Sequence, residues 1–286
     1  MRKLSKLLVI LVLVAFSAMG VGAEWNKASK ASLVASLMQQ SGMAAQIEMI
    51  PEQVKMGIRD SARQGAPMDV VIQDKLIGSL DTKSLSQDLQ AYLVEQISFD
   101  EIRQVMVWLE SPLGKKVVAM EINASQSEMM SKMFDVFQVE SVRPGRVERV
   151  HRLGEAVLSK ERTRDLMINI QTFFGMAMVA ERGTTQPVSY GATRDNMERA
   201  MAPMWGELEQ VVMMMYLFTY QGLSDAELDQ YLEFTESAVG RRYNRALYEG
   251  LSRAFLNAGR SLRQSLKSAC RVRKKGCDGT HPYPLV

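Results

Sequence analysis

The chain has 286 residues, of which 47% are hydrophobic and 23% are charged, so it has enough apolar residues for an extensive buried core. Its formal net charge is only +3, and residues 260–286 alone hold seven basic residues against one acidic residue. Because the rest of the chain has no basic excess, we expect no nucleic-acid partner.

The first 23 residues have the three parts of a secretory signal peptide. Three basic residues precede position 7, an apolar run covers 7–16, and small residues occupy 21–23. The run is too short to cross a bilayer comfortably, although an uncleaved membrane anchor is the alternative. We therefore predict cleavage before residue 24 and a location in the periplasm. Removal of the three basic residues from the total of 35 leaves 32, which equals the 32 acidic residues.

The remaining chain has the three-to-four-residue apolar spacing of helices. Few runs alternate in the manner of strands, so the predicted fold class is all-α. Pro51 is expected to interrupt the first helix, and Pro203 is expected to kink or divide the segment 194–221. The segments with helical spacing are 29–49, 51–61, 68–80, 85–97, 112–137, 148–181, 194–221 and 244–269.

A Pro-Gly pair at Pro144 divides the helical pattern into two halves of similar size. We predict two tandem helical domains after the signal peptide, followed by a basic tail. The expected boundaries are 1–23 for the signal peptide, 24–141 for the first domain, 142–150 for a linker, 151–269 for the second domain and 270–286 for the tail.

The two halves share a sequence motif. ISFDEIRQVMVWLESPLGKKV at 97–117 aligns without a gap with LSDAELDQYLEFTESAVGRRY at 223–243, an offset of 126 (223 minus 97). A repeat of this length indicates two copies of one domain rather than a solenoid of short units. The identical positions in the first copy are Ser98, Glu101, Gln104, Glu110, Ser111 and Gly114.

Each copy begins with the pattern S-x-x-E, which is typical of a helix N-terminal capping box. The following S-P-x-G-K-K in the first copy indicates a break and the start of a new helix at Pro112. In the second copy Ala238 replaces the proline, so the proline is not obligatory.

This pattern resembles the exported bacterial family known as domain of unknown function 2059. The resemblance covers the C-terminal third of each half, and it implies an all-helical domain and export. It implies no activity and no catalytic residue.

No catalytic motif accompanies these residues. Gly114-Lys115 lacks the preceding strand, the first glycine and the following hydroxyl residue of a phosphate-binding loop. The Glu110-Ser111 pair lacks the other signature residues of a lytic transglycosylase, and the mature chain has only two histidines. We expect a protein without enzymatic activity, cofactor or metal.

The tail contains both cysteines, Cys270 and Cys277, in the sequence CRVRKKGC. An even count in an exported chain predicts a disulfide that closes a small basic loop. A metal site at this place would need more ligands. The cations expected to form contact surfaces are Lys115, Lys116, Arg241 and Arg242 in the motifs and Arg271, Arg273, Lys274 and Lys275 in the tail.

Two hypotheses for function follow. The first is a module that binds an as yet unknown protein partner without catalysis. The second is a binder of lipid or another apolar ligand in a groove rich in methionine, for which the run Met213-Met214-Met215 is the main indication. In the second case the basic tail would rest on an anionic membrane surface, whereas the alternative is a terminal helix docked on its own domain.

Overall fold

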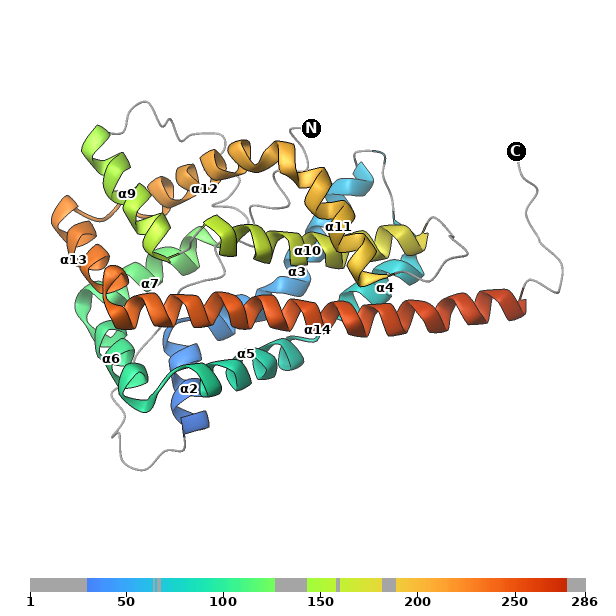
Figure 1. Ribbon diagram of the computed structural model, residues 1–286, viewed down its shortest axis with the longest axis horizontal. Helices are drawn as coiled ribbons and strands as arrows, with labels where there is room; N and C mark the ends of the chain where they lie inside the picture. The colour runs from blue at the N-terminus through green and yellow to red at the C-terminus, as the bar shows by residue number, and fades with distance from the viewer. Residues whose placement is uncertain are drawn as a thin grey trace.

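The computed structural model describes residues 30–63, 65, 68–126, 143–157, 160–181 and 189–276 (Figure 1). These residues form helices joined by short turns and contain no β-strand, which confirms the all-α prediction. The predicted signal peptide lies outside the described residues. The helices are α2 (Lys30–Gln40), α3 (Met43–Arg63), α4 (Val70–Gly78), α5 (Thr82–Gln96), α6 (Phe99–Glu110), α7 (Pro112–Ala124), α9 (Pro144–Val157), α10 (Lys160–Glu181), α11 (Tyr190–Met201), α12 (Trp205–Thr219), α13 (Asp225–Glu236) and α14 (Ala238–Gly276), with a short 3-10 helix, η2 (Ala202–Met204), before α12.

The first helical segment breaks at Gly42 rather than at Pro51. Gly42 has a φ of 61°, a conformation that glycine adopts without steric cost, and it separates α2 from α3. Pro51 lies inside α3, between the buried side chains of Ile50 and Val54. We attribute the continuity of α3 to this burial, because packing of an apolar face outweighs the hydrogen bond that proline removes.

Pro144 and Pro203 lie at or next to helix starts, as Pro112 does at the start of α7. Pro144 is the first residue of α9, so most of the expected linker at 142–150 is helical. Proline suits this position, because its φ is already helical and the first N–H of a helix has no partner within it. Pro203 lies in η2, which separates α11 from α12 as predicted.

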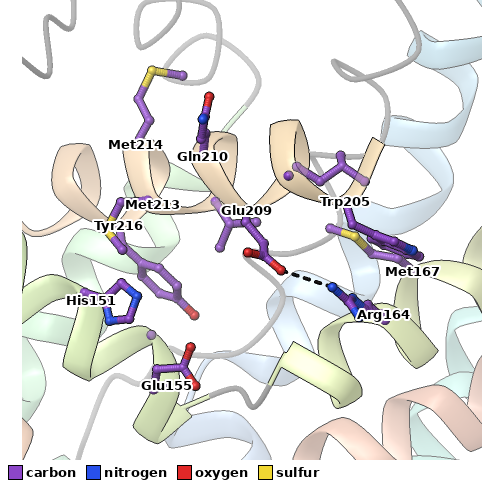
Figure 2. Close-up of a pocket in the computed structure, with 14 residues that line it drawn as sticks. His151, Glu155, Arg164, Met167, Trp205, Glu209, Gln210, Met213, Met214 and Tyr216 are labelled. Carbon is purple, nitrogen blue, oxygen red and sulfur yellow. Dashed lines mark hydrogen bonds and ion pairs between the residues drawn. The ribbon is translucent and has the colours of Figure 1, made fainter. Parts of the chain in front are cut away.

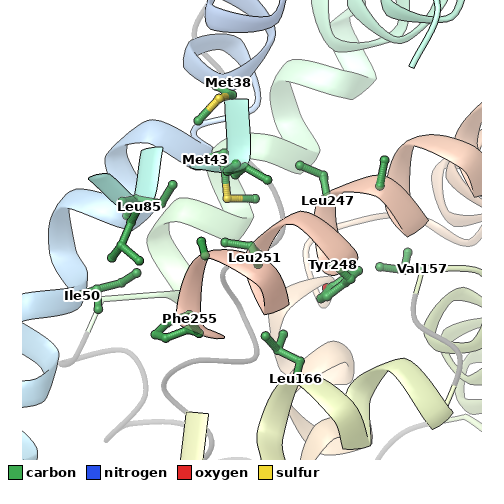
Figure 3. Close-up of a cluster of buried hydrophobic side chains, with 14 of the residues drawn as sticks. Met38, Met43, Ile50, Leu85, Val157, Leu166, Leu247, Tyr248, Leu251 and Phe255 are labelled. Carbon is green, nitrogen blue, oxygen red and sulfur yellow. The ribbon is translucent and has the colours of Figure 1, made fainter. Parts of the chain in front are cut away.

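Helix α14 is the centre of the molecule. In Figure 1 it runs the length of the fold, with α5 along one side and α10 along the other, and both helices pack against it. Figure 3 shows side chains of α14, among them Leu251 and Phe255, between Ile50 and Leu85 of the first half and Leu166 of the second. Residues of both halves thus share one continuous core. Among the described residues, the predicted division into two domains does not appear as two separate cores.

The apolar face predicted for the last helix is confirmed. It is docked inside the protein, and its residues Leu247, Leu251, Phe255, Ala258, Leu262 and Leu266 are all buried. No helix in the described part of the chain has both the length and the apolar composition required to cross a membrane.

The helix continues further than predicted, to Gly276. Residues 270–276 therefore extend α14 instead of starting a loop. A helix advances about 1.5 Å along its axis per residue, so residues 271–276 lead away from Cys270 and do not turn back toward it. Cys277 lies outside the described residues, and the disulfide remains a prediction.

Candidate functional site

The repeated motif forms the same helical corner in both halves. Ser98 and Ser224 each cap a helix in a full capping box with the glutamate three residues later. At the end of the first of these helices, Gly114 N–H donates to Ser111 Oγ at 2.9 Å, and in the other corner Gly240 N–H donates to the Ser237 hydroxyl at 3.0 Å. The serine hydroxyls are thus hydrogen-bond acceptors that hold each corner.

The two glycines are required by close contact. A Cβ on Gly114 would lie 2.1 Å from the carbonyl oxygen of Trp108, and a Cβ on Gly240 would lie 2.0 Å from that of Phe234. Any side chain would therefore force the two helices of the corner apart. The presence of glycine at the same position of both corners thus has a steric explanation.

The motif glutamates hold the first helix of their own half. Glu236 Oε2 forms an ion pair with Arg152 of α9 at 2.9 Å, and Glu110 accepts a hydrogen bond from Gln40 of α2 at 3.5 Å. Both carboxylates act as packing partners between helices. Neither glutamate belongs to a cluster of three or more potential metal ligands among the described residues.

The second cation of each motif forms an ion pair with a glutamate of the other motif. Lys116 Nζ lies 2.6 Å from Glu227 Oε1, and Arg242 Nε lies 2.9 Å from Glu101 Oε1. The hydrogen bond from Lys116, assisted by those from Ser224, lowers the pKa of Glu227 to about 2. Lys116 and Arg242 thus link the two corners to each other, a role that the sequence analysis had not assigned to them.

The other predicted contact cations are placed only in part. Lys115 and Arg241 are exposed next to the corners. The basic residues Arg271, Arg273, Lys274 and Lys275 belong to the last two turns of α14, and their side chains are outside the described set.

A buried glutamate lies where the two halves meet. Glu121 of α7 is 2% exposed and accepts hydrogen bonds from the hydroxyls of Tyr220 at 2.5 Å and Tyr231 at 3.1 Å. Its Oε2 has no hydrogen-bond partner among the described residues. Burial raises the pKa of Glu121 to about 8, although the two tyrosine hydrogen bonds act in the opposite direction. At neutral pH this carboxyl is mainly protonated.

A pocket of about 670 Å³ opens between α9, α10 and α12 (Figure 2). This volume lies within the range typical of small-molecule sites, about 300–1,000 Å³. Much of the wall is apolar, and three of its side chains are methionines. The apolar and aromatic residues that line it are Met167, Trp205, Leu208, Val212, Met213, Met214 and Tyr216.

Charged groups surround this apolar wall. Figure 2 shows His151 and Glu155 of α9 on one side and Arg164 of α10 on the other. Arg164 pairs with Glu209 at 3.3 Å, and its guanidinium lies 5.4 Å from the centre of the Trp205 ring. Among the described residues, these side chains belong to no cluster of three or more potential metal ligands.

Helix α12 has an unusual surface for a partly exposed helix. Its sequence WGELEQVVMMMYLFT is apolar on nearly every side, which is typical of a fully buried helix. Residues 211–214 are nevertheless only half-buried. Part of the apolar surface of α12 is therefore left uncovered by the rest of the described chain at the pocket.

A comparison with known families bears on the first corner. Residues 83–135 match the family model "Uncharacterized protein conserved in bacteria (DUF2059)". The described part of this DUF2059 match includes nearly all of α5, together with α6 and α7, and thus the whole first corner. No curated protein and no solved structure gave a significant match.

The DUF2059 match leaves the pocket outside its range, and sequence reasoning located the pocket only in part. Met213 and Met214 had been assigned to an apolar groove, whereas Met215 of the same run is buried in the core. Arg164 and Trp205 carried no local signal, because they meet only through the fold. Glu121 did carry a signal, a single acid within the apolar run VVAMEINA of α7.

Proposed function

We propose that this protein is a non-enzymatic binding protein whose pocket between α9, α10 and α12 holds an apolar ligand such as the acyl chain of a lipid. The half-buried side chains of Val212, Met213 and Met214 of α12, which line a pocket of about 670 Å³, are the observation that carries the proposal. Methionine side chains are flexible and polarizable, so they adapt to chains of different length.

The pocket favours the second of the two sequence-based hypotheses over the first. Two of the four motif cations proposed as a surface for a protein partner, Lys116 and Arg242, are engaged in ion pairs within the chain. An acyl chain, by contrast, needs only a concave apolar wall. The charged groups at the pocket would then face the polar end of the ligand.

Glycine substitutions provide a sharp test of the site. Gly206 lines the pocket, and a Cβ there would meet no atom within 4 Å. Gly206→Trp should therefore obstruct part of the pocket without a clash at its Cβ. Gly191 is its matched control, because it is also the second residue of a helix, has equally open surroundings and does not line the pocket.

Native mass spectrometry of gently purified protein would measure occupancy. We expect a co-purifying small mass in the native chain and in Gly191→Trp, and its loss in Gly206→Trp. Displacement of the uncharged dye N-phenyl-1-naphthylamine by palmitate should follow the same pattern. If the Gly206→Trp variant still carried the small mass and still bound the dye and palmitate, the site would be refuted. Apo protein that crosslinks to one specific protein partner would support the first hypothesis.

We further propose that the chain is exported to the periplasm after cleavage of residues 1–23. The signal-peptide pattern of the sequence supports this proposal. N-terminal sequencing of the protein from the periplasmic fraction should begin at Glu24. Recovery of the uncleaved chain in the membrane fraction would contradict it.

A further inference from the structure

The contacts between the two corners are reciprocal. Lys116 of the first corner binds Glu227 of the second, and position 116 plus the repeat offset of 126 is 242. Arg242 in turn binds Glu101, whose equivalent in the second corner is Glu227. Each corner thus offers the same cation position to the same capping glutamate of the other.

A third contact joins a position to its own equivalent. The rings of Trp108 and Phe234, which are 126 residues apart, stack with centroids 4.2 Å apart and an interplanar angle of 7°. Both side chains are half-buried. A residue that touches its own equivalent lies next to a two-fold axis.

The helices beyond the corners repeat this exchange. Helix α14, which follows the second corner, packs on α5 and α6 of the first half. Helix α7, which follows the first corner, packs on α12 and α13 of the second half. With the offset of 126, α12 and α13 correspond to α5 and α6, so each half covers the equivalent helices of the other.

Only a two-fold rotation produces this set of contacts. If two copies were stacked side by side by translation, residue 116 could meet position 227, but residue 242 would point away from position 101. A rotation that carries the first copy onto the second and the second onto the first satisfies both ion pairs and the stacked rings together. This is the geometry of an isologous dimer interface.

We propose that the corner is a self-recognition surface: its partner is a second module that carries the same corner, and this chain is a covalently joined pair of such modules. The interface combines an aromatic stack at its centre with two ion pairs at its edges. Charge complementarity favours this orientation, because contact between the two cation positions or between the two glutamates would place like charges together. A second copy of the module, rather than an unrelated protein, is therefore the partner that fits.

An exchange of equivalent side chains tests the two-fold relation. In the variant Trp108→Phe with Phe234→Trp, the same two rings face each other with their positions reversed. If the positions are equivalent, this variant should have a clearly higher melting temperature than Trp108→Phe alone, which should lower it by several degrees.

A matched exchange across a pair that is not equivalent is the control. Trp108 also stacks on Tyr231, with centroids 5.2 Å apart and an interplanar angle of 18°, but their sequence separation is not the repeat offset. The variant Trp108→Tyr with Tyr231→Trp should lose more than about 4 °C. Equal losses in the two exchanged variants would overturn the two-fold relation.

A second measurement tests recognition without the covalent link. A protease site inserted within 127–142 of the full chain would allow cleavage after folding, between the two modules. We expect both fragments to elute together in size-exclusion chromatography at micromolar concentration. Separation of the fragments would overturn the proposal that the surface holds the modules together.

Discussion

Replacement of Glu121 by glutamine should stabilise the protein at neutral pH. Glutamine has nearly the same shape and can still accept hydrogen bonds from the hydroxyls of Tyr220 and Tyr231. It never ionises, whereas the glutamate must keep a proton in the folded state because burial raises its pKa to about 8.

The size and sign of the effect follow from the pKa of Glu121 in the unfolded chain and its pKa in the folded protein. In the unfolded chain Glu121 ionises near 4.5, so its protonated form contributes full stability below that pH. The contribution declines as the pH rises from 4.5 and is lost above about 8. This interval corresponds to as much as about 5 kcal/mol, with about 3 kcal/mol already lost at pH 7.

Urea unfolding of both proteins between pH 4 and pH 9 provides the assay. We expect the free energy of unfolding of Glu121→Gln, relative to that of the native protein, to rise steadily from pH 4 to about pH 8. Glu233→Gln, at an exposed position of α13, should not change the pH dependence in this way. A constant difference between Glu121→Gln and the native protein across the whole range would refute a raised pKa.

Three further substitutions test the fold and the corner. Gly114→Ala should cost at least about 2–3 kcal/mol in chemical unfolding, because its Cβ would overlap a backbone carbonyl, while Gly78→Ala, in open space, should be nearly neutral. Ser98→Ala should lower the free energy of unfolding by about 1 kcal/mol through loss of the capping box, and an unchanged value would show that water replaces the cap. Tyr220→Phe should cost about 1–3 kcal/mol near pH 5, because it removes a buried hydrogen bond to Glu121, and a neutral effect there would contradict that bond.

Local sequence determined the helices and their corners. The capping boxes of Ser98 and Ser224 and the break at Ser111 involve residues only three positions apart, so the sequence alone predicted them correctly. The apolar face of α14 was predictable for the same reason, because helical spacing is a local property. Gly42 and Pro51 show the limit, since burial of α3 decided which of the two ended a helix.

The similarity of 97–117 and 223–243 was visible in the sequence, but the contacts between the two segments were not. Two copies of a motif are equally compatible with separate tandem domains and with an interlocked pair. Only the tertiary structure placed Lys116 against Glu227 and Arg242 against Glu101, because these contacts join residues more than a hundred positions apart.

The pocket and the buried acid were likewise decided by the fold. The methionines of α12 indicated an apolar surface, yet the cavity exists only because α9, α10 and α12 leave space between them. Glu121 stood out as an acid among apolar residues, and its protonation results from its burial in the folded protein, where Tyr220 and Tyr231 donate hydrogen bonds to it. Sequence thus determined which surfaces are apolar or capped, and tertiary packing determined which of them are filled by the chain itself and which remain open.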